Sequence, residues 1–255
     1  MKQKVKNISN RFTLEIAQWE GIETIVLGEA ARIETFDPYF NIDLDVYFHG
    51  SLLPSNDRRE RFAHPGGFET SPIFPIDRFM VEELPVSIHY KDVSRMALLL
   101  KRVEEGSWVF RRDSTNLLYR IENAEVLYSK TDWFEGLRQR ITSIPEIFWN
   151  ALTEAARFSL DQYLNGIGAA VYRGDNLYYQ FSASGFCQSL CSYVFALNRK
   201  FEPTGRLLYD RIKSLKVLPD EFLGRFNSFI RPDQKLSPER KFEIAKLLAK
   251  SISML

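Results

Sequence analysis

Two acidic residues, Asp43 and Asp45, stand two positions apart in the otherwise apolar segment Ile42–Val46. In an extended strand, residues two positions apart point to the same face, so both carboxylates would project together. Neighbouring carboxylates repel one another, and on an apolar strand they cost stability unless a cation lies between them. Mg²⁺ is a hard cation that binds carboxylate oxygens and substrate phosphates together. We therefore expect Asp43 and Asp45 to be catalytic, metal-binding residues, with a solvated strand face as the alternative.

The segment before this pair of carboxylates gives it a context. The β-branched run Ile22–Leu27 ends at Gly28, which predicts a buried strand that is stopped by a turn. One or two helical turns could follow over residues 30–34, and Asp37-Pro38 marks another turn before a strand over residues 42–48. A glycine turn, a gap of short-helix length and the paired carboxylates thus follow one another, and this order favours the chemical interpretation.

Two stretches of the chain resemble known families. Gly28-Glu29-Ala30-Ala31-Arg32, followed by Asp37-Pro38-Tyr39-Phe40-Asn41-Ile42-Asp43-Leu44-Asp45, resembles the nucleotidyltransferase superfamily, where a glycine-serine turn precedes an Asp-x-Asp strand. In the C-terminal half, Ala196-Leu197-Asn198-Arg199 resembles the helical domain of kanamycin-nucleotidyltransferase-type proteins of the DUF4037-like kind.

This resemblance implies an α+β fold. A nucleotidyltransferase-like mixed β-sheet domain with helices would occupy residues 1–130, and an all-α helical bundle domain would occupy residues 131–255. It also implies a Mg²⁺-dependent enzyme that moves a nucleoside monophosphate from a nucleoside triphosphate to an unknown small-molecule or protein hydroxyl. Asp43 and Asp45 would then hold the metal, and Gly28, Glu29 and Arg32 would bind the nucleotide.

The chain departs from the family pattern at the phosphate-binding turn and in the carboxylate strand. The serine expected after Gly28 is Glu29, whose carboxylate would repel a phosphate unless it points away. Aligning Asp-Pro-Tyr places Asn41 and Asp43 at the two carboxylate positions, whereas the bare motif selects Asp43 and Asp45. One of the two ligands would be an amide under the first alignment.

The third carboxylate of the family also lacks a clear counterpart. On the predicted strand Val86–Tyr90, Ser87 and His89 occupy the polar face, and Glu82 and Glu83 could serve only if the strand begins earlier. These departures motivate a second hypothesis, in which a catalytically degenerate protein of this fold binds a ligand or acts as a protein-interaction module. A third hypothesis makes the helical domain a dimerisation surface, so that the chain forms a homodimer.

The polar segment 49–70 predicts a long exposed loop, because it is rich in glycine, proline and charged residues. Its arginines, among them Arg58, could close over a triphosphate. Beyond residue 130 the strand pattern fades and short connections separate helical patterns, as in a bundle. We predict helices over residues 133–142, 145–164, 177–199, 204–215, 219–230 and 237–254.

The amino-acid composition limits which class of protein the chain can belong to. Of the 255 residues, 45% are hydrophobic and 26% are charged, which is typical of a globular chain with room for two domains. A net charge of +1 gives no electrostatic argument for a nucleic acid or a membrane as partner. Residues 1–10 lack the apolar region of a secretory signal, and no apolar stretch is long enough to span a bilayer. The chain has two cysteines, Cys187 and Cys191. We therefore expect a cytoplasmic protein.

Overall fold

The computed structural model describes residues 2–28, 40–62, 67–70, 75–107, 114–233 and 235–252. The chain forms two compact units, and each unit combines two stretches of sequence. The sheet unit comprises Met1–Val103 and Arg120–Ile144, and the helical unit comprises Glu104–Tyr119 and Pro145–Leu255. The predicted division of the chain at residue 130 stays a prediction.

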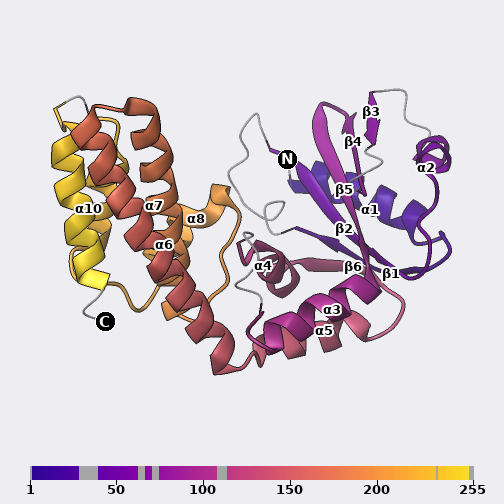
Figure 1. Ribbon diagram of the computed structural model, residues 1–255. Helices are drawn as coiled ribbons and strands as arrows, with labels where there is room; N and C mark the ends of the chain where they lie inside the picture. The colour runs from indigo at the N-terminus through magenta and orange to yellow at the C-terminus, as the bar shows by residue number, and fades with distance from the viewer. Residues whose placement is uncertain are drawn as a thin grey trace. The chain divides into compact units, whose positions relative to one another are not determined.

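The sheet unit is built around a mixed β-sheet (Figure 1). In the described residues the sheet has six strands in the order β3-β4-β5-β2-β1-β6, and β2 and β5 pair in parallel while the other neighbours are antiparallel. The strands are β1 Ile22–Leu27, β2 Ile42–Phe48, β3 Phe68–Thr70, β4 Ile76–Val81, β5 Leu84–Asp92 and β6 Glu125–Ser129. The helices near them are α1 Lys2–Ile16, α2 Ser55–Phe62, α3 Val93–Glu104, α4 Asn116–Asn123 and α5 Trp133–Thr142.

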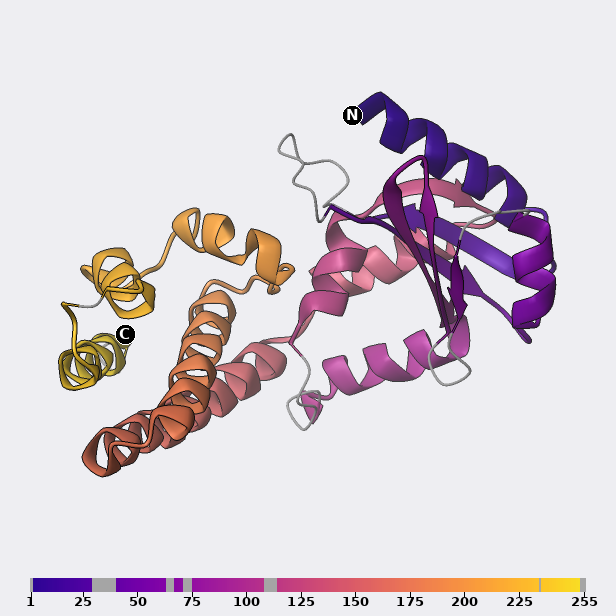
Figure 2. The same ribbon diagram turned by 90° about the horizontal axis from the view of Figure 1, so that it is seen from above.

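One face of this sheet is packed against α1 (Figure 2). The buried hydrophobic residues of α1 recur every three or four positions, which places them on one side of the helix, and they are Val5, Ile8, Phe12 and Ile16. They share a core with Ile42, Leu44 and Val46 of β2. Because side chains alternate along a strand, this packing turns Asp43, Asp45 and Tyr47 to the opposite face, as the sequence predicts for the two aspartates.

The polar segment 49–70 is not one long loop, because it contains α2 and β3. Arg58 of α2 is buried, and its Nε and Nη2 donate to the two carboxylate oxygens of Asp77 at 2.7 Å each. Its Nη1 donates to the carbonyl oxygen of Leu53 at 2.6 Å, and its guanidinium lies 4.9 Å from the ring centroid of Tyr90. The hypothesis that this arginine closes over a triphosphate is therefore wrong, since Asp77 already pairs with it.

The helical unit confirms the predicted all-α C-terminal part. Its helices are α6 Glu146–Arg173, α7 Asn176–Leu197, α8 Gly205–Lys213, α9 Phe222–Ile230 and α10 Pro238–Ile252. α6 and α7 lie side by side, and α10 packs against α6 and α9 (Figure 1). A Cβ atom on Gly185 of α7 would lie 2.3 Å from the ring of Tyr163, so α6 and α7 approach closely there. None of the described helices combines the length and the apolar character that spanning a bilayer requires.

Residues 104–119 join the helical unit through a reciprocal pair of hydrogen bonds. Thr115 Oγ1 accepts from the backbone N–H of Glu202 at 2.8 Å, and the Glu202 carboxylate accepts from the backbone N–H of Thr115 and from Ser192. Burial raises the pKa of Glu202 above its ordinary value of 4.5, and these hydrogen bonds oppose the rise only in part.

We predict that Asp77→Ala lowers the free energy of unfolding by about 3 kcal/mol or more, because it leaves the Arg58 charge buried without its partner. Arg59→Ala is the matched control, since Arg59 is exposed on the same helix. It should change the free energy of unfolding by no more than about 0.5 kcal/mol. Urea unfolding measures both values, and equal shifts of the two midpoints would contradict a structural role for the pair.

Glu202→Gln should stabilise the protein at neutral pH. Because burial raises the folded-state pKa of Glu202, its contribution to stability is complete below the unfolded value of 4.5. That contribution is lost as the pH rises through the folded-state pKa, whereas glutamine stays neutral throughout. We expect a higher melting temperature than wild type at pH 7.5 and a smaller difference at pH 4.5. The exposed control Glu154→Gln should show no such trend, and a variant less stable than wild type at pH 7.5 would refute the assignment.

Candidate functional site

The face of β2 opposite α1 carries the two predicted carboxylates. The Asp43 side chain is 25% exposed and the Asp45 side chain is 1% exposed. In the parallel register with β5, Asp43 lies beside Ser87 and Asp45 lies beside His89. Lys91 follows two positions after His89 and therefore shares its face.

Asp45 is paired with two cationic side chains. Lys91 Nζ lies 2.7 Å from Asp45 Oδ2, and Arg120 Nη2 lies 2.6 Å from Asp45 Oδ1. Arg120 Nε also donates to Oδ2 at 3.0 Å, so the guanidinium binds both carboxylate oxygens. Both oxygens of this buried aspartate are thus bonded to positive charges of the protein itself.

The ionisation of this cluster follows from those contacts. Burial alone would raise the pKa of Asp45, but Lys91, Arg120 and His89 together lower it to about 2. Burial lowers the pKa of Lys91, and the neighbouring Asp45 opposes that shift. For Arg120 the carboxylates outweigh burial and raise the pKa above its ordinary value. The aspartate is therefore ionised at neutral pH.

The position of Arg120 depends on α4, and α5 holds the end of that helix. Arg138 of α5 donates from Nε to the carbonyl oxygen of Ile121 at 3.0 Å and from Nη2 to the carbonyl oxygen of Ala124. These bonds satisfy carbonyls that the end of a helix leaves without a partner. The sequence prediction missed both cations. Alternation along β5 could have identified Lys91, but no local pattern links Arg120 to Asp45.

Asp43 has a different environment from Asp45. Asn41 Nδ2 donates to Asp43 Oδ1 at 2.6 Å and to Ser87 Oγ at 3.0 Å. His89 Nε2 lies 3.5 Å from the same carboxylate oxygen. The backbone N–H of Gly28 donates to the carbonyl oxygen of Asp43 at 2.9 Å, so the end of β1 contacts the strand at this residue.

The structure thus brings Gly28, Asp43 and Asp45 together, whereas Glu29 and Arg32 lie outside the described residues. The proposed third carboxylates do not lie on β5, which begins at Leu84. Glu82 and Glu83 form the turn before it, with φ angles of 49° and 69° in the left-handed region. Glu82 Oε2 lies 3.7 Å from Lys4 Nζ instead.

The donor set on β2 does not fit a pair of Mg²⁺ ions in this arrangement. Mg²⁺ needs oxygen ligands in near-ideal octahedral geometry, but the oxygens of Asp45 already bind Lys91 and Arg120. In the part of the chain that the structure describes, no three histidine, cysteine, aspartate or glutamate residues are grouped so that they could hold a metal ion.

The lowered pKa of Asp45 predicts how stability depends on pH. A fall from 3.8 to about 2, at about 1.36 kcal/mol per unit, contributes about 2 kcal/mol to the free energy of unfolding. The contribution is complete above pH 3.8 and is lost as the pH falls through about 2. The Asp45→Asn variant lacks this contribution and should be less stable than the wild type at pH 5. Urea unfolding should show that the difference in free energy of unfolding between the two proteins shrinks as the pH falls from 5 to 2.5. Parallel curves for the two proteins would contradict this origin of the shift.

Comparisons with known proteins give likenesses to several solved structures. A nucleotidyltransferase-like protein from Exiguobacterium sibiricum has 10% sequence identity and a TM-score of 0.48, over 100% of this chain and 74% of that one. Spectinomycin adenyltransferase AAD(9) from Enterococcus faecialis, in a structure with ATP and spectinomycin, has 12% identity and a TM-score of 0.41, over 98% and 99% of the two chains. No curated protein matches the chain. Residues 110–206 match the model of a domain of unknown function, DUF4037, so the chain carries a DUF4037-like region.

Proposed function

We propose that this chain is a catalytically degenerate nucleotidyltransferase-like protein that binds a nucleotide without metal-dependent transfer. The observation that carries the proposal is the pairing of both Asp45 oxygens with Lys91 and Arg120. The sequence resemblance around Gly28 and the Asp-x-Asp strand supports the nucleotide as ligand, and the contact of Gly28 with Asp43 is consistent with it.

Electrostatics favours binding without a metal. Two like unit charges about 4 Å apart repel by about 4 kcal/mol near a protein surface, and a divalent ion doubles the effect. A metal ion on Asp45 would therefore meet strong repulsion from Lys91 and Arg120, which lie within hydrogen-bonding distance of the same carboxylate. These two side chains already neutralise the charge that a metal would neutralise.

Mg²⁺-dependent transfer to an unknown hydroxyl acceptor is the second candidate function. One observation favours it: the Asp43 side chain is 25% exposed beside the end of β1, so part of it can be reached from solvent. Under this candidate, Asp45 would have to exchange its contacts with Lys91 and Arg120 for contacts with a metal ion.

Titration calorimetry with ATP separates the two functions. We expect binding in EDTA with an affinity within about threefold of that in Mg²⁺, and no release of pyrophosphate. Asp43→Asn should keep or tighten this binding, because it removes a negative charge that repels the phosphates. Asp161→Asn, exposed on α6, is the control for a loss of charge elsewhere.

A metal-dependent transferase gives the opposite result. Its binding of ATP would require Mg²⁺, pyrophosphate would be released in the presence of a suitable acceptor, and Asp43→Asn would abolish both. If the protein binds ATP under neither condition, the nucleotide is not its ligand.

A further inference from the structure

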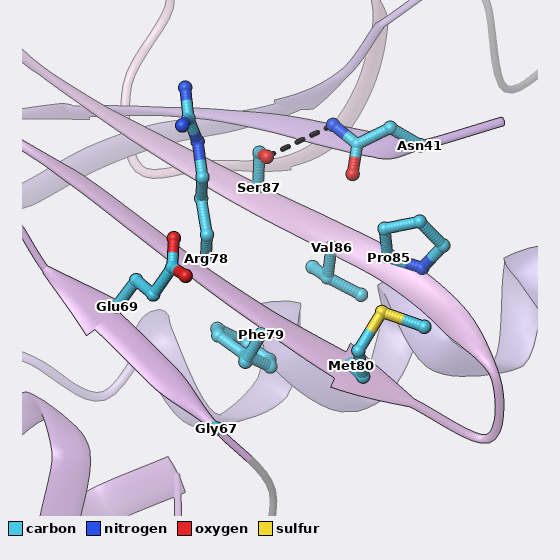
Figure 3. Close-up of a pocket in the computed structure, with 9 residues that line it drawn as sticks. All are labelled: Asn41, Gly67, Glu69, Arg78, Phe79, Met80, Pro85, Val86 and Ser87. Carbon is cyan, nitrogen blue, oxygen red and sulfur yellow. Dashed lines mark hydrogen bonds between the residues drawn. The ribbon is translucent and has the colours of Figure 1, made fainter. Parts of the chain in front are cut away.

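A pocket of about 360 Å³ lies in the sheet unit over β3, β4 and β5 (Figure 3). Small-molecule sites commonly begin at about this size. The side chains that matter for its chemistry are Asn41, Glu69, Arg78, Met80, Pro85 and Ser87. The sequence patterns did not predict this pocket.

The polar wall of the pocket is a single cross-strand row. Glu69 of β3 pairs with Arg78 of β4, and Arg78 pairs with Ser87 of β5. Ser87 in turn lies beside Asp43 of β2. Directly opposed residues of neighbouring strands project to the same face about 5 Å apart. A negative, a positive, a neutral and a negative side chain therefore follow one another across four strands.

Arg78 and Glu69 can both bind a ligand. Their side chains are exposed, and Figure 3 shows them pointing to the same side of the sheet. In the described part of the chain no ion pair within 4.0 Å joins either of them to another residue. The pocket thus offers one guanidinium and one carboxylate that form no ion pair within 4.0 Å with a described residue.

Asn41 adds an acceptor of fixed orientation. A carboxylate only accepts hydrogen bonds, so the amide nitrogen of Asn41 must face Asp43, and its second hydrogen reaches Ser87. The amide oxygen is left on the other side, and Figure 3 shows it pointing away from Ser87. A ligand with an N–H group can donate to it.

The opposite part of the pocket is apolar. Met80 pairs with Pro85 in the β4–β5 register, so their side chains lie next to each other. Met80 is 48% exposed, which leaves an apolar surface beside the charged row. A thioether adapts readily to the shape of an aliphatic group.

We propose that this pocket binds a small zwitterion of the α-amino-acid type with an aliphatic side chain. The ligand carboxylate binds the Arg78 guanidinium, which suits a planar anion. Its ammonium donates to Glu69, which lies beside Arg78 across the two strands, and its side chain packs on Met80 and Pro85. A polyphosphate fits less well, because Glu69 and Asp43 flank the arginine with negative charge.

The test is titration calorimetry of the full chain in EDTA with L-leucine and two analogues. 4-Methylpentanoate lacks the ammonium group, and 3-methylbutylamine lacks the carboxylate. We expect saturable binding of leucine and at least tenfold weaker binding of each analogue. Arg78→Gln and Glu69→Gln should each weaken leucine binding tenfold or more, whereas the exposed control Arg95→Gln should leave it unchanged. Matching circular dichroism spectra check that each variant is folded.

Three results would overturn the proposal: no saturable binding of leucine, equal binding of the analogues, or binding that neither Arg78→Gln nor Glu69→Gln weakens. The outcome is separate from that of the ATP titration. Leucine binding without ATP binding would remove the proposed nucleotide function alone, and ATP binding without leucine binding would remove this proposal alone.

Discussion

Asp45 is a buried carboxylate that stays ionised because two cationic side chains of the protein compensate its charge. Lys91 comes from β5 and Arg120 from α4, so the neutralisation of one aspartate joins two strands and a helix. The same contacts that allow Asp45 to be buried also occupy the oxygens that a metal would need. Stability and chemistry at this strand are therefore not independent, because both depend on which cation the aspartate holds.

Local patterns predicted much of the sheet. The runs Ile22–Leu27 and Ile42–Phe48 are strands with those bounds, since alternation and β-branched residues are local signals. Other features depend on distant contacts. The prediction of a loop over residues 49–70 overlooked α2, because its two buried residues, Arg58 and Phe62, form no apolar period and their partners lie elsewhere in the sequence.

The candidate site shows the same division. The two aspartates were found from their spacing, and their shared face follows from strand geometry. Arg120 could not be found in this way, because 75 positions of sequence separate it from Asp45. The row formed by Glu69, Arg78, Ser87 and Asp43 was equally hidden, since the register between strands decides which residues become neighbours.

The division of α4 between the two units has a practical consequence for work with fragments. A fragment that begins at residue 145 would keep Glu202 but lack Thr115, so the buried glutamate would lose a backbone partner. A fragment that ends at residue 103 would lack both Arg120 and β6. Neither fragment then contains a complete unit, because each unit combines two stretches of the chain.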